Sequence, residues 1–543
     1  MTTAAREHAL RQAQTDTFDL AVVGGGITGA GAAREASLRG FSTCLLEARD
    51  FASGTSSRST RLIHGGLRYL RMGDVRLVRE SLAERELLRR TMAPHLVQAL
   101  PFYFPIYRGD PDPLWLVRLG ISFYGRLSAA PPEDIALHLT PQDLLQAMPL
   151  LRQEDLGGGA RYIDATTDDA RLTIAVLRDA QARGATVLNY APVRDIVRDG
   201  DLHALACRDE ESGESFRVRA RRVLVAAGPW TDEVVRMLEP AGSPLVRRSA
   251  GSHLVVRSGR LPLSAACVLR GADGRMLFAV PHGAETYLGT TEVPAEDPDG
   301  ALVPRPEAEY ILAAADRAFP AAHLGAHDVI GAWRGVRPLA RAGRLLGAAG
   351  RVSREDRLVT VAGGVDVVVG GKLTAFRAMA ERIVDRIFPG SGSDEASAQS
   401  RSALPGAQGE RLPDERWRQA ARRAGLRVDD LRRQLRPYGD EAAAVLALGS
   451  SPGDHGFSLD RAILRFAIAR EYALHLVDVY RRRTERLLFG GDFALQHLQA
   501  DAEEMSRLLG WSSARRAAEM EAVRHADLDM LAWRAPNSDE ILR

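Results

Sequence analysis

The stretch FDLAVVGGGITGAGAAREASLRG, residues 18–40, decides the fold of this chain. An apolar run, a glycine-rich turn and small residues with helical spacing follow one another, which predicts a strand, a turn and a helix. Gly24, Gly26 and Gly29 fit the pattern G-x-G-x-x-G. In that pattern the first glycine allows the tight turn, the second lets the backbone approach a pyrophosphate, and the third lets the helix pack on the strand.

A second apolar run, STCLLE at residues 42–47, ends in Glu47. Dinucleotide-binding folds place an acidic residue about 20 positions beyond the glycines, where it accepts hydrogen bonds from ribose hydroxyls. An acid at this position favours an unphosphorylated adenosine ribose. The opening of the chain therefore predicts a binding site for FAD or NAD and disfavours NADP.

Composition excludes several classes of protein. The chain has 543 residues, so two or three domains are expected. It carries 72 Lys and Arg against 70 Asp and Glu, so no overall positive field favours nucleic acid. Cys44, Cys207 and Cys267 are too few and too scattered for a disulfide framework or a metal site, and we interpret them as buried small hydrophobic residues in a reducing compartment.

Two features bear on localisation. The first 16 residues contain charges but no apolar core, so we expect a frayed tail and no secretory signal. No run approaches the roughly 18 consecutive apolar residues of a spanning helix, so any membrane contact is expected to be peripheral. The segment LWLVRLGISFYGRL, residues 114–127, fits an interfacial helix and equally a core helix with surface arginines.

Two later segments favour FAD over NAD. VLVAAGPWTDEV, residues 223–234, predicts a strand that runs into a small-residue turn at Gly228, and many flavoproteins return to their cofactor through such a strand. LVTVAGGVDVVVGGKLTAF, residues 358–376, predicts strands and a glycine pair in front of a helix. Glycines there suggest backbone that approaches the flavin, with an ordinary left-handed turn as the alternative.

Segments spread over nearly the whole chain from about Phe18 resemble the FAD-dependent glycerol-3-phosphate dehydrogenases. They are the glycine stretch above, SSRSTRLIHGGLRYL (56–70), VRLVRESLAERELLRRTMAPHL (75–96), YIDATTDDARL (162–172), AAGPW (226–230), GSHLVV (251–256), GTTE (289–292), GVRPL (335–339) and GGKLTAFR (370–377). The block around HGGLRYL is the most specific of them. Two departures stand out: Glu292 replaces an expected aspartate, and residues 341–351 replace a more polar loop.

The resemblance implies an α/β fold in which a discontinuous, Rossmann-like FAD-binding domain is joined to an antiparallel-sheet substrate or cap domain and a C-terminal all-helical domain. We expect the FAD-binding domain at 18–90, 155–240 and 330–388, and the cap at 91–154 and 241–329. Residues 389–412, rich in Gly, Ser and Pro, are expected to form a linker, and 413–535 the helical domain.

Together, the residue pattern and the resemblance assign the flavin-side residues. These are Gly24, Gly26, Gly29, Glu47, Thr55, Ser56, Ser59, His64, Gly65, Gly66, Gly228, Gly371, Lys372, Leu373 and Thr374.

The substrate pocket must neutralise a phosphate monoester, which requires several cations in fixed geometry, preferably arginine forks. By resemblance the pocket residues are Arg68, Tyr69, Arg337, Arg354 and Lys372. His253 is the candidate for accepting the hydroxyl proton or for hydrogen bonding to the reacting oxygen, because an imidazole titrates in the useful range. We expect His253 and Arg337 to be the catalytic residues. His64 is a second candidate for accepting the proton, but its neighbouring glycines suit a flavin contact better.

The implied reaction is oxidation of sn-glycerol 3-phosphate to dihydroxyacetone phosphate, with hydride transfer from C2 to flavin N5. The resemblance also implies electron transfer to a quinone, a cytoplasmic protein peripheral on the membrane, and a homodimer as one arrangement. Three alternatives stay open: an oxidase that uses oxygen, a related FAD enzyme acting on an amine or hydroxy acid, and a flavin-binding assembly protein without turnover. Neither nucleic acid nor a metal ion is expected.

Overall fold

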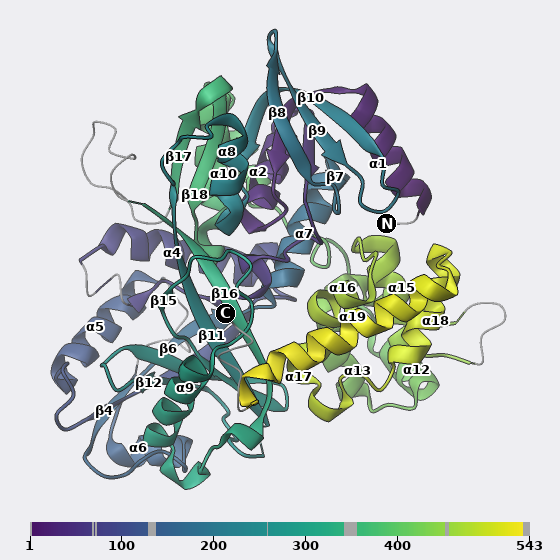
Figure 1. The fold of residues 1–543 in the computed structure, drawn as a ribbon. Helices are drawn as coiled ribbons and strands as arrows, with labels where there is room; N and C mark the ends of the chain where they lie inside the picture. The colour runs from purple at the N-terminus through teal and green to yellow at the C-terminus, as the bar shows by residue number, and fades with distance from the viewer. Residues whose placement is uncertain are drawn as a thin grey trace.

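The computed structural model describes residues 3–67, 70, 73–128, 137–257, 259–341, 356–450 and 456–535. Figure 1 shows two β-sheets with their helices and a separate group of helices at the C-terminal end of the chain. This arrangement confirms the predicted α/β fold class with a helical C-terminal domain.

The first sheet contains the glycine motif. Its strand order is β17-β18-β10-β1-β2-β7, and its central strands run parallel. Alternate residues of β1 face opposite layers: Leu20 and Val22 pack with α2, α7 and α10, whereas Ala21 and Val23 pack with the β8–β9 hairpin and α1. Burial on both faces explains why the sequence reads as a continuous apolar run.

The elements of this part have the following bounds: α1 Thr3–Thr15, β1 Thr17–Val23, α2 Ile27–Leu38, β2 Thr43–Leu46, α7 Asp169–Ala182, β7 Thr186–Leu188, β8 Val193–Asp199, β9 Leu202–Arg208, β10 Ser215–Val225, α8 Thr231–Leu238, β17 Asp356–Val361, β18 Val365–Gly370 and α10 Phe376–Ile387.

The expectation of a frayed N-terminal tail is wrong. Residues Thr3–Thr15 form helix α1, and Ala9 and Ala13 are buried against the sheet. Arg6 is also buried; it donates to Asn189 and pairs with Asp209 at 2.5 Å. Two alanines four positions apart and one arginine give the helix its packed face, a signal too weak to be read from composition.

The second sheet lies beside the first, and its strand order is β15-β11-β14-β13-β12-β4-β6-β3, with β16 paired to β11 and β5 to β6. Among the described strands of this sheet, every pairing is antiparallel except that of β4 with β12, as expected for a cap. Strands β6 and β16, which lie in segments expected to belong to the FAD-binding domain, instead pair in this sheet. Their partners are distant in the sequence and could not be read from local patterns: β16 pairs with β11 from Val246 to Val256, and β6 pairs with β4.

Its elements are β3 Leu62–Ile63, α4 Val75–Leu87, β4 Gln98–Tyr107, α5 Leu114–Leu127, β5 Leu137–Leu139, α6 Pro141–Ala147, β6 Leu156–Thr166, β11 Val246–Arg257, β12 Ala266–Arg270, β13 Met276–His282, β14 Glu285–Gly289, β15 Val293–Pro294, α9 Arg305–Ala318 and β16 Val329–Ala340.

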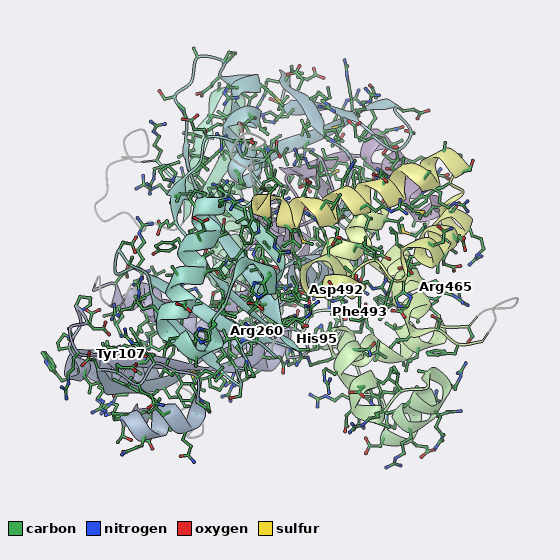
Figure 2. The ribbon with its side chains drawn as sticks, turned by 60° about the horizontal axis from the view of Figure 1, so that its bottom comes forward. His95, Tyr107, Arg260, Arg465, Asp492 and Phe493 are labelled. Carbon is green, nitrogen blue, oxygen red and sulfur yellow. The ribbon has the colours of Figure 1, made fainter. Side chains whose placement is uncertain are left out.

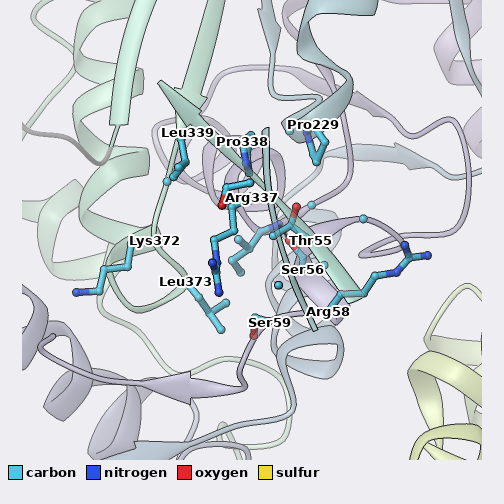
Figure 3. Close-up of a pocket in the computed structure, with 18 of the residues that line it drawn as sticks. Thr55, Ser56, Arg58, Ser59, Pro229, Arg337, Pro338, Leu339, Lys372 and Leu373 are labelled. Atoms are coloured by element: carbon cyan, nitrogen blue, oxygen red, sulfur yellow. Dashed lines mark hydrogen bonds between the residues drawn. The ribbon is translucent and has the colours of Figure 1, made fainter. Parts of the chain in front are cut away.

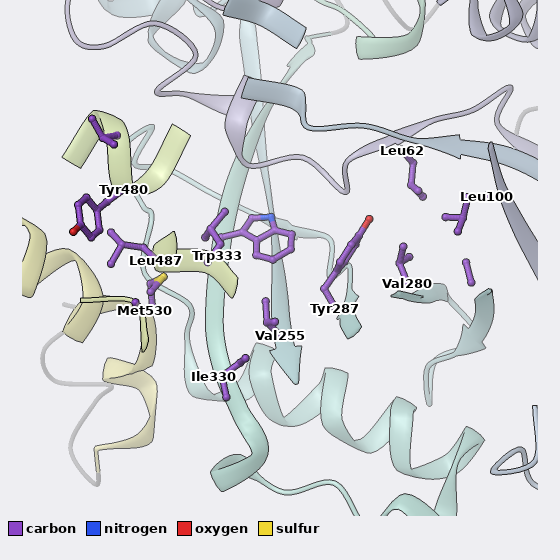
Figure 4. Packing of buried hydrophobic residues seen from close by; sticks show 14 of the residues in the cluster. Leu62, Leu100, Val255, Val280, Tyr287, Ile330, Trp333, Tyr480, Leu487 and Met530 are labelled. Carbon is purple, nitrogen blue, oxygen red and sulfur yellow. The ribbon is translucent and has the colours of Figure 1, made fainter. Parts of the chain in front are cut away.

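The C-terminal helices pack on the second sheet through one apolar cluster. Tyr480, Leu487 and Met530 of these helices belong to the same cluster as Trp333 and Ile330 of β16, and Figure 4 shows the two groups next to each other. At the border, Arg257 of β11 pairs with Asp492 at 2.5 Å, and Figure 2 shows Asp492 between the two parts of the molecule.

The helices of this part are α11 Asp394–Ser400, α12 Asp414–Ala424, α13 Val428–Leu435, α14 Ala442–Ala447, α15 Leu459–Arg470, α16 Leu476–Asp478, α17 Arg486–Phe489, α18 Leu498–Leu509 and α19 Ser513–Leu531, with a π-helical turn η10 at Val479–Arg483.

The segment expected as a linker, 389–412, is packed onto the body of the protein. It contains α11, and both Ser400 and Leu404 are fully buried. Arg34 donates to the carbonyl of Ser400 at 2.8 Å. The composition of this segment, rich in small and polar residues, is typical of a flexible linker, but here these residues fit closely against neighbouring helices.

Cys44, Cys207 and Cys267 are buried and unbridged, as expected. Among the described helices, none combines the length and the apolar character needed to span a bilayer.

Candidate active site

A cavity of about 1580 Å³ lies between the two sheets. Its lining includes the β1–α2 turn and Glu47 from the first sheet, and His253 and Arg337 from the second. Figure 3 shows Arg337 pointing into the space between the 55–59 loop and the turn that carries Leu373. A cavity of this size exceeds that of ordinary small-molecule sites and leaves room for a dinucleotide and a substrate together.

The glycines of the motif lie where the backbone leaves little room for a side chain. Gly24 has φ +118°, and a Cβ there would lie 2.4 Å from the carbonyl oxygen of Ala226 at the end of β10. A Cβ on Gly29 would lie 2.0 Å from the carbonyl oxygen of Gly24, so this glycine packs the helix on the strand and does not line the cavity. Gly26 lines the cavity at the N-terminus of α2.

Glu47 ends β2 at the cavity wall. One carboxylate oxygen accepts a hydrogen bond from the backbone N–H of Gly25 at 2.6 Å, and the other accepts from that of Arg49 at 2.9 Å. Burial raises the pKa of this carboxyl, whereas the two backbone N–H groups favour its charged form. The side chain is thus fixed in the place where a ribose is expected.

The hydroxyls of the loop after β2 anchor that loop to its neighbours. Thr55 donates to the carbonyl of Val336 at 2.6 Å, and Ser56 accepts from the N–H of Ile27 at 2.9 Å. Ser59 donates to Asp169 at 2.6 Å. Each of the three serine and threonine residues also lines the cavity.

The turn after β18 meets the HGG segment. Gly371 has φ +132° and lies opposite Thr28 of α2. Thr374 exchanges hydrogen bonds with the backbone of His64, at 3.1 and 3.3 Å. Burial, followed by the charges of Lys372 and Arg85, lowers the pKa of His64 to about 3, so its imidazole is neutral.

The predicted residues Gly66, Gly228 and Leu373 also line the cavity, with φ +85° at Gly66 and +55° at Gly228. Gly65 does not line it; a Cβ there would lie 2.6 Å from the hydroxyl of Tyr124, so this glycine serves packing.

Lys372 lines the cavity, but its ammonium points away from Arg337 (Figure 3). It donates to Ser81 at 2.9 Å and to the carbonyl of Gly65 at 3.2 Å. The structure therefore does not bring these two predicted phosphate ligands together. Arg68, Tyr69 and Arg354 lie outside the described residues.

His253 and Arg337 come together on adjacent strands. Nε2 of His253 lies 3.0 Å from the hydroxyl of Thr60, and its ring stacks on Trp333 at 4.6 Å between centroids. Its Nδ1 is buried without a partner among the described residues. Burial, together with the positive charges of Arg337 and Arg61, lowers the pKa of His253 well below its usual range.

Arg337 reaches over β11 at Gly251, where a Cβ would lie 3.0 Å from its guanidinium. The same guanidinium lies 3.4 Å from the hydroxyl of Thr290. A cation at the cavity wall beside a neutral imidazole suits an anionic substrate that must give up a proton.

Sequence reasoning missed Thr60, Trp333 and Asp169. Thr60 directly follows Ser59 in a segment already singled out, so its neighbourhood was a usable signal. Trp333 is placed by the register of β16 on β11, which pairs it with His253. Asp169 accepts hydrogen bonds from both the backbone and the hydroxyl of Ser59, a long-range contact without a local sequence pattern.

These features fit FAD. A strand–glycine–helix turn opens on the cavity, a buried carboxylate ends the next strand, and a second glycine turn lies opposite the first. The residues that would hold the cofactor belong to these three elements.

Two family models match the chain. One, described as FAD dependent oxidoreductase, matches residues 19–386, and another, described as the C-terminal domain of alpha-glycerophosphate oxidase, matches residues 397–516.

Relatives and solved structures agree with these matches. The aerobic glycerol-3-phosphate dehydrogenase of Staphylococcus haemolyticus is 30% identical over 541 residues, covering 95% of each chain. That of Staphylococcus aureus is 30% identical over 544 residues and covers 97% of each. The glycerol-3-phosphate dehydrogenase of Bacillus halodurans, solved with FAD, has a TM-score of 0.81 and 30% identity over 98% of each chain. Glycine oxidase of Geobacillus kaustophilus, at 23% identity and a TM-score of 0.51, shares the fold.

Proposed function

The chain belongs to the family of FAD-dependent glycerol-3-phosphate dehydrogenases and oxidises glycerol 3-phosphate, and we propose that Arg337 binds the substrate phosphate while His253 accepts the hydroxyl proton. These roles rest on one observation: an arginine that faces the cavity and a neutral, buried histidine lie on the adjacent strands β16 and β11. Product is dihydroxyacetone phosphate.

FAD, when bound, supplies the acceptor for the hydride that leaves C2 of the substrate. The chain's own residues position the substrate. Arg337 offers a guanidinium fork to the phosphate, a geometry that matches its oxygens. Held at one end, the substrate presents its secondary hydroxyl to the other side of the pocket.

His253 then accepts the proton from that hydroxyl. Its buried Nδ1 has no partner among the described residues, while Thr60 and Trp333 fix the ring. A neutral imidazole is the form that can take a proton, and the lowered pKa keeps it neutral at physiological pH. Before substrate binds, the positive charge of Arg337 disfavours a protonated His253. Once bound, the substrate phosphate would offset the charge of Arg337, so the imidazole could then accept a proton.

The cofactor is assigned to the β1–α2 turn, Glu47, the 55–59 loop, the His64–Gly66 segment and the 370–374 turn. These segments line one continuous cavity or support its wall. The N-terminus of α2 opens on the cavity at Gly26, Ile27 and Thr28, and a helix N-terminus suits the pyrophosphate. Arg68, Tyr69 and Arg354 complete the proposed substrate pocket by resemblance.

We further propose that electrons pass to a quinone at a membrane surface. Helix α5 supports this proposal because it is apolar on two sides: Val117 and Ile121 are buried, whereas Trp115 and Leu119 are 66% and 60% exposed. Leu116 and Phe123 extend the exposed apolar face. A contiguous exposed patch of this kind is typical of an interfacial helix.

Oxygen is the second candidate for the electron acceptor, and the match of residues 397–516 to an oxidase's C-terminal domain favours keeping it. Purified FAD-loaded protein is given glycerol 3-phosphate with either a soluble quinone analogue or oxygen. We expect quinone reduction to exceed oxygen consumption at least tenfold. Peroxide release at an equal rate contradicts the quinone proposal.

Replacing Leu119 with aspartate tests the membrane surface. A charge in the middle of the exposed face of α5 should lower binding to anionic lipid vesicles about tenfold, because a carboxylate resists burial in the lipid boundary and is repelled by anionic headgroups. Co-sedimentation measures the bound fraction. Leu528→Asp is the matched control, since Leu528 is 67% exposed in α19. Equal binding of both variants contradicts the assignment of α5.

A further inference from the structure

A second, smaller cavity lies where the FAD-binding part meets the C-terminal helices. Its volume is about 90 Å³, enough for a few water molecules or a small ion. Its charged lining consists of four arginines, Arg58, Arg334, Arg481 and Arg482, and one carboxylate, Asp529. These residues come from the loop after β2, from β16, from η10 and from α19.

Two of the four arginines are neutralised within the protein. Arg334 pairs with Glu307 at 3.1 Å. Arg482 pairs with Asp478 at 2.8 Å and also with Asp50. Their positive charges therefore leave little field in the cavity.

The other two form no ion pair with any carboxylate in the described part of the chain. Arg58 makes no side-chain hydrogen bond or ion pair with any described residue. Arg481 donates one N–H to the carbonyl of Ala526 at 3.2 Å, while its Nε is buried with no partner among the described residues. Asp529 is exposed and lies beyond ion-pair distance of both guanidinium groups.

Burial and mutual repulsion act on both groups. Burial, then the charges of Arg481 and Arg482, lowers the pKa of Arg58 to about 9. Burial, then Arg482, lowers the pKa of Arg481 to about 10. Both still carry their charge at neutral pH, and the carboxylates that act on them, Asp299 on Arg58 and Asp529 on Arg481, do so without forming an ion pair.

We propose that this cavity binds a small oxyanion of the size of inorganic phosphate, held between Arg58 and Arg481. Arg58 and Arg481 are both half-buried, and a charge that is partly removed from water is costly unless it is paired. An oxyanion supplies acceptors for guanidinium forks from two sides. Arginine prefers such planar, bidentate contacts, which a monatomic anion cannot offer.

Arg58 lines both this small cavity and the larger one, whereas Arg481 lines only the small cavity. In Figure 3 the guanidinium of Arg58 points away from Arg337. The backbone of Arg58 nevertheless belongs to the loop that carries Thr55, Ser56 and Ser59, and its carbonyl packs on Gly335. A bound oxyanion would therefore tie the flavin-side loop to η10 of the C-terminal domain.

Thermal unfolding of FAD-loaded protein tests the site. Inorganic phosphate is titrated into Arg337→Gln protein, in which the substrate pocket is weakened, so the outcome does not depend on the proposed function. We expect the unfolding temperature to rise by about 2 °C, because a ligand that binds only the folded state stabilises it. The rise should disappear when Arg481→Gln is added and persist when Arg416→Gln, an exposed arginine of α12, is added instead.

No rise in the first protein, or the same rise in all three, overturns the proposal. An equal rise with chloride at matched ionic strength overturns the choice of an oxyanion. If the Arg481→Gln protein fails to fold, wild-type crystals soaked in selenate decide the matter: an anomalous selenium peak between Arg58 and Arg481 is expected, and its absence overturns the proposal.

Discussion

The imidazole of His253 has a chemistry set by its surroundings. Burial and the charges of Arg337 and Arg61 keep it neutral, the Trp333 ring holds its plane, and the Thr60 hydroxyl occupies Nε2. Nδ1 is buried and has no partner among the described residues. The sequence marks this histidine only through the GSHLVV match, while its partners come from distant segments.

Replacing His253 with asparagine should lower kcat for glycerol 3-phosphate about 100-fold, a usual size for losing a general base. Since the pKa of His253 lies well below 6.5, the acid limb of the wild-type rate profile should fall below the normal histidine range. Stopped-flow rates across pH measure both effects, and an unchanged ratio of flavin to protein absorbance shows that the site is intact. His327→Asn, with a side chain that is 80% exposed, is the control. Near-wild-type kcat in His253→Asn would make the residue structural.

At the scale of elements, the β1–α2 unit shows how close backbone approach is built into the fold. Gly24 combines a left-handed conformation with a Cβ position only 2.4 Å from the carbonyl of Ala226. Gly40, just after α2, has φ +82° but open space around it. The two positions separate the effect of backbone strain from that of steric contact.

Gly24→Ala should lower the unfolding temperature and release FAD, because β10 must move away from the turn. Gly40→Ala carries only the conformational cost, about 1 kcal/mol, and should keep FAD. The ratio of flavin absorbance to protein absorbance after gel filtration measures retention. Equal retention in both variants contradicts the close approach of strand and turn.

The β1–α2–β2 unit was predictable because its pattern is local: an apolar run, fixed glycine spacing and a terminal acid. The sheet to which β16 belongs was not predictable, because the apolar pattern of a strand does not say which strand it pairs with. Its partner β11 lies about eighty residues earlier. Helix α1 was missed because its face is two alanines and an arginine. In the site, the motifs marked Arg337 and His253 as candidates, and both line the cavity, whereas the direction of Lys372 depends on Ser81, a contact between distant segments.

At the scale of the whole molecule, His475 joins the C-terminal helices to the FAD-binding sheet. Its Nδ1 lies 2.6 Å from Glu519 of α19, and its Nε2 lies 2.8 Å from Glu211 in the β9–β10 turn. Burial opposes the charged form, but hydrogen bonds to Glu211 and Glu519 raise the pKa of His475 to about 10.

This junction predicts a loss of stability in mild alkali. The folded pKa lies above the unfolded value of about 6.5, so the contribution is complete below that pH and is lost as the pH rises toward 10. The slope is at most about 1.4 kcal/mol per pH unit for one proton. Unfolding midpoints from pH 6 to 10 should fall more steeply in wild type than in His475→Gln. His525→Gln, an exposed control in α19, should follow wild type, and parallel curves for all three contradict the role of His475.

The central claim is that one cavity holds FAD and selects glycerol 3-phosphate through Arg337. Anaerobic mixing of the FAD-loaded protein with glycerol 3-phosphate, followed by flavin absorbance, tests it most directly. Rapid bleaching is predicted with glycerol 3-phosphate and not with glycerol, and bleaching about 100-fold slower in Arg337→Gln, because the charge-assisted contact to phosphate is lost. A flavin that stays oxidised, or one that bleaches equally with glycerol, contradicts the account.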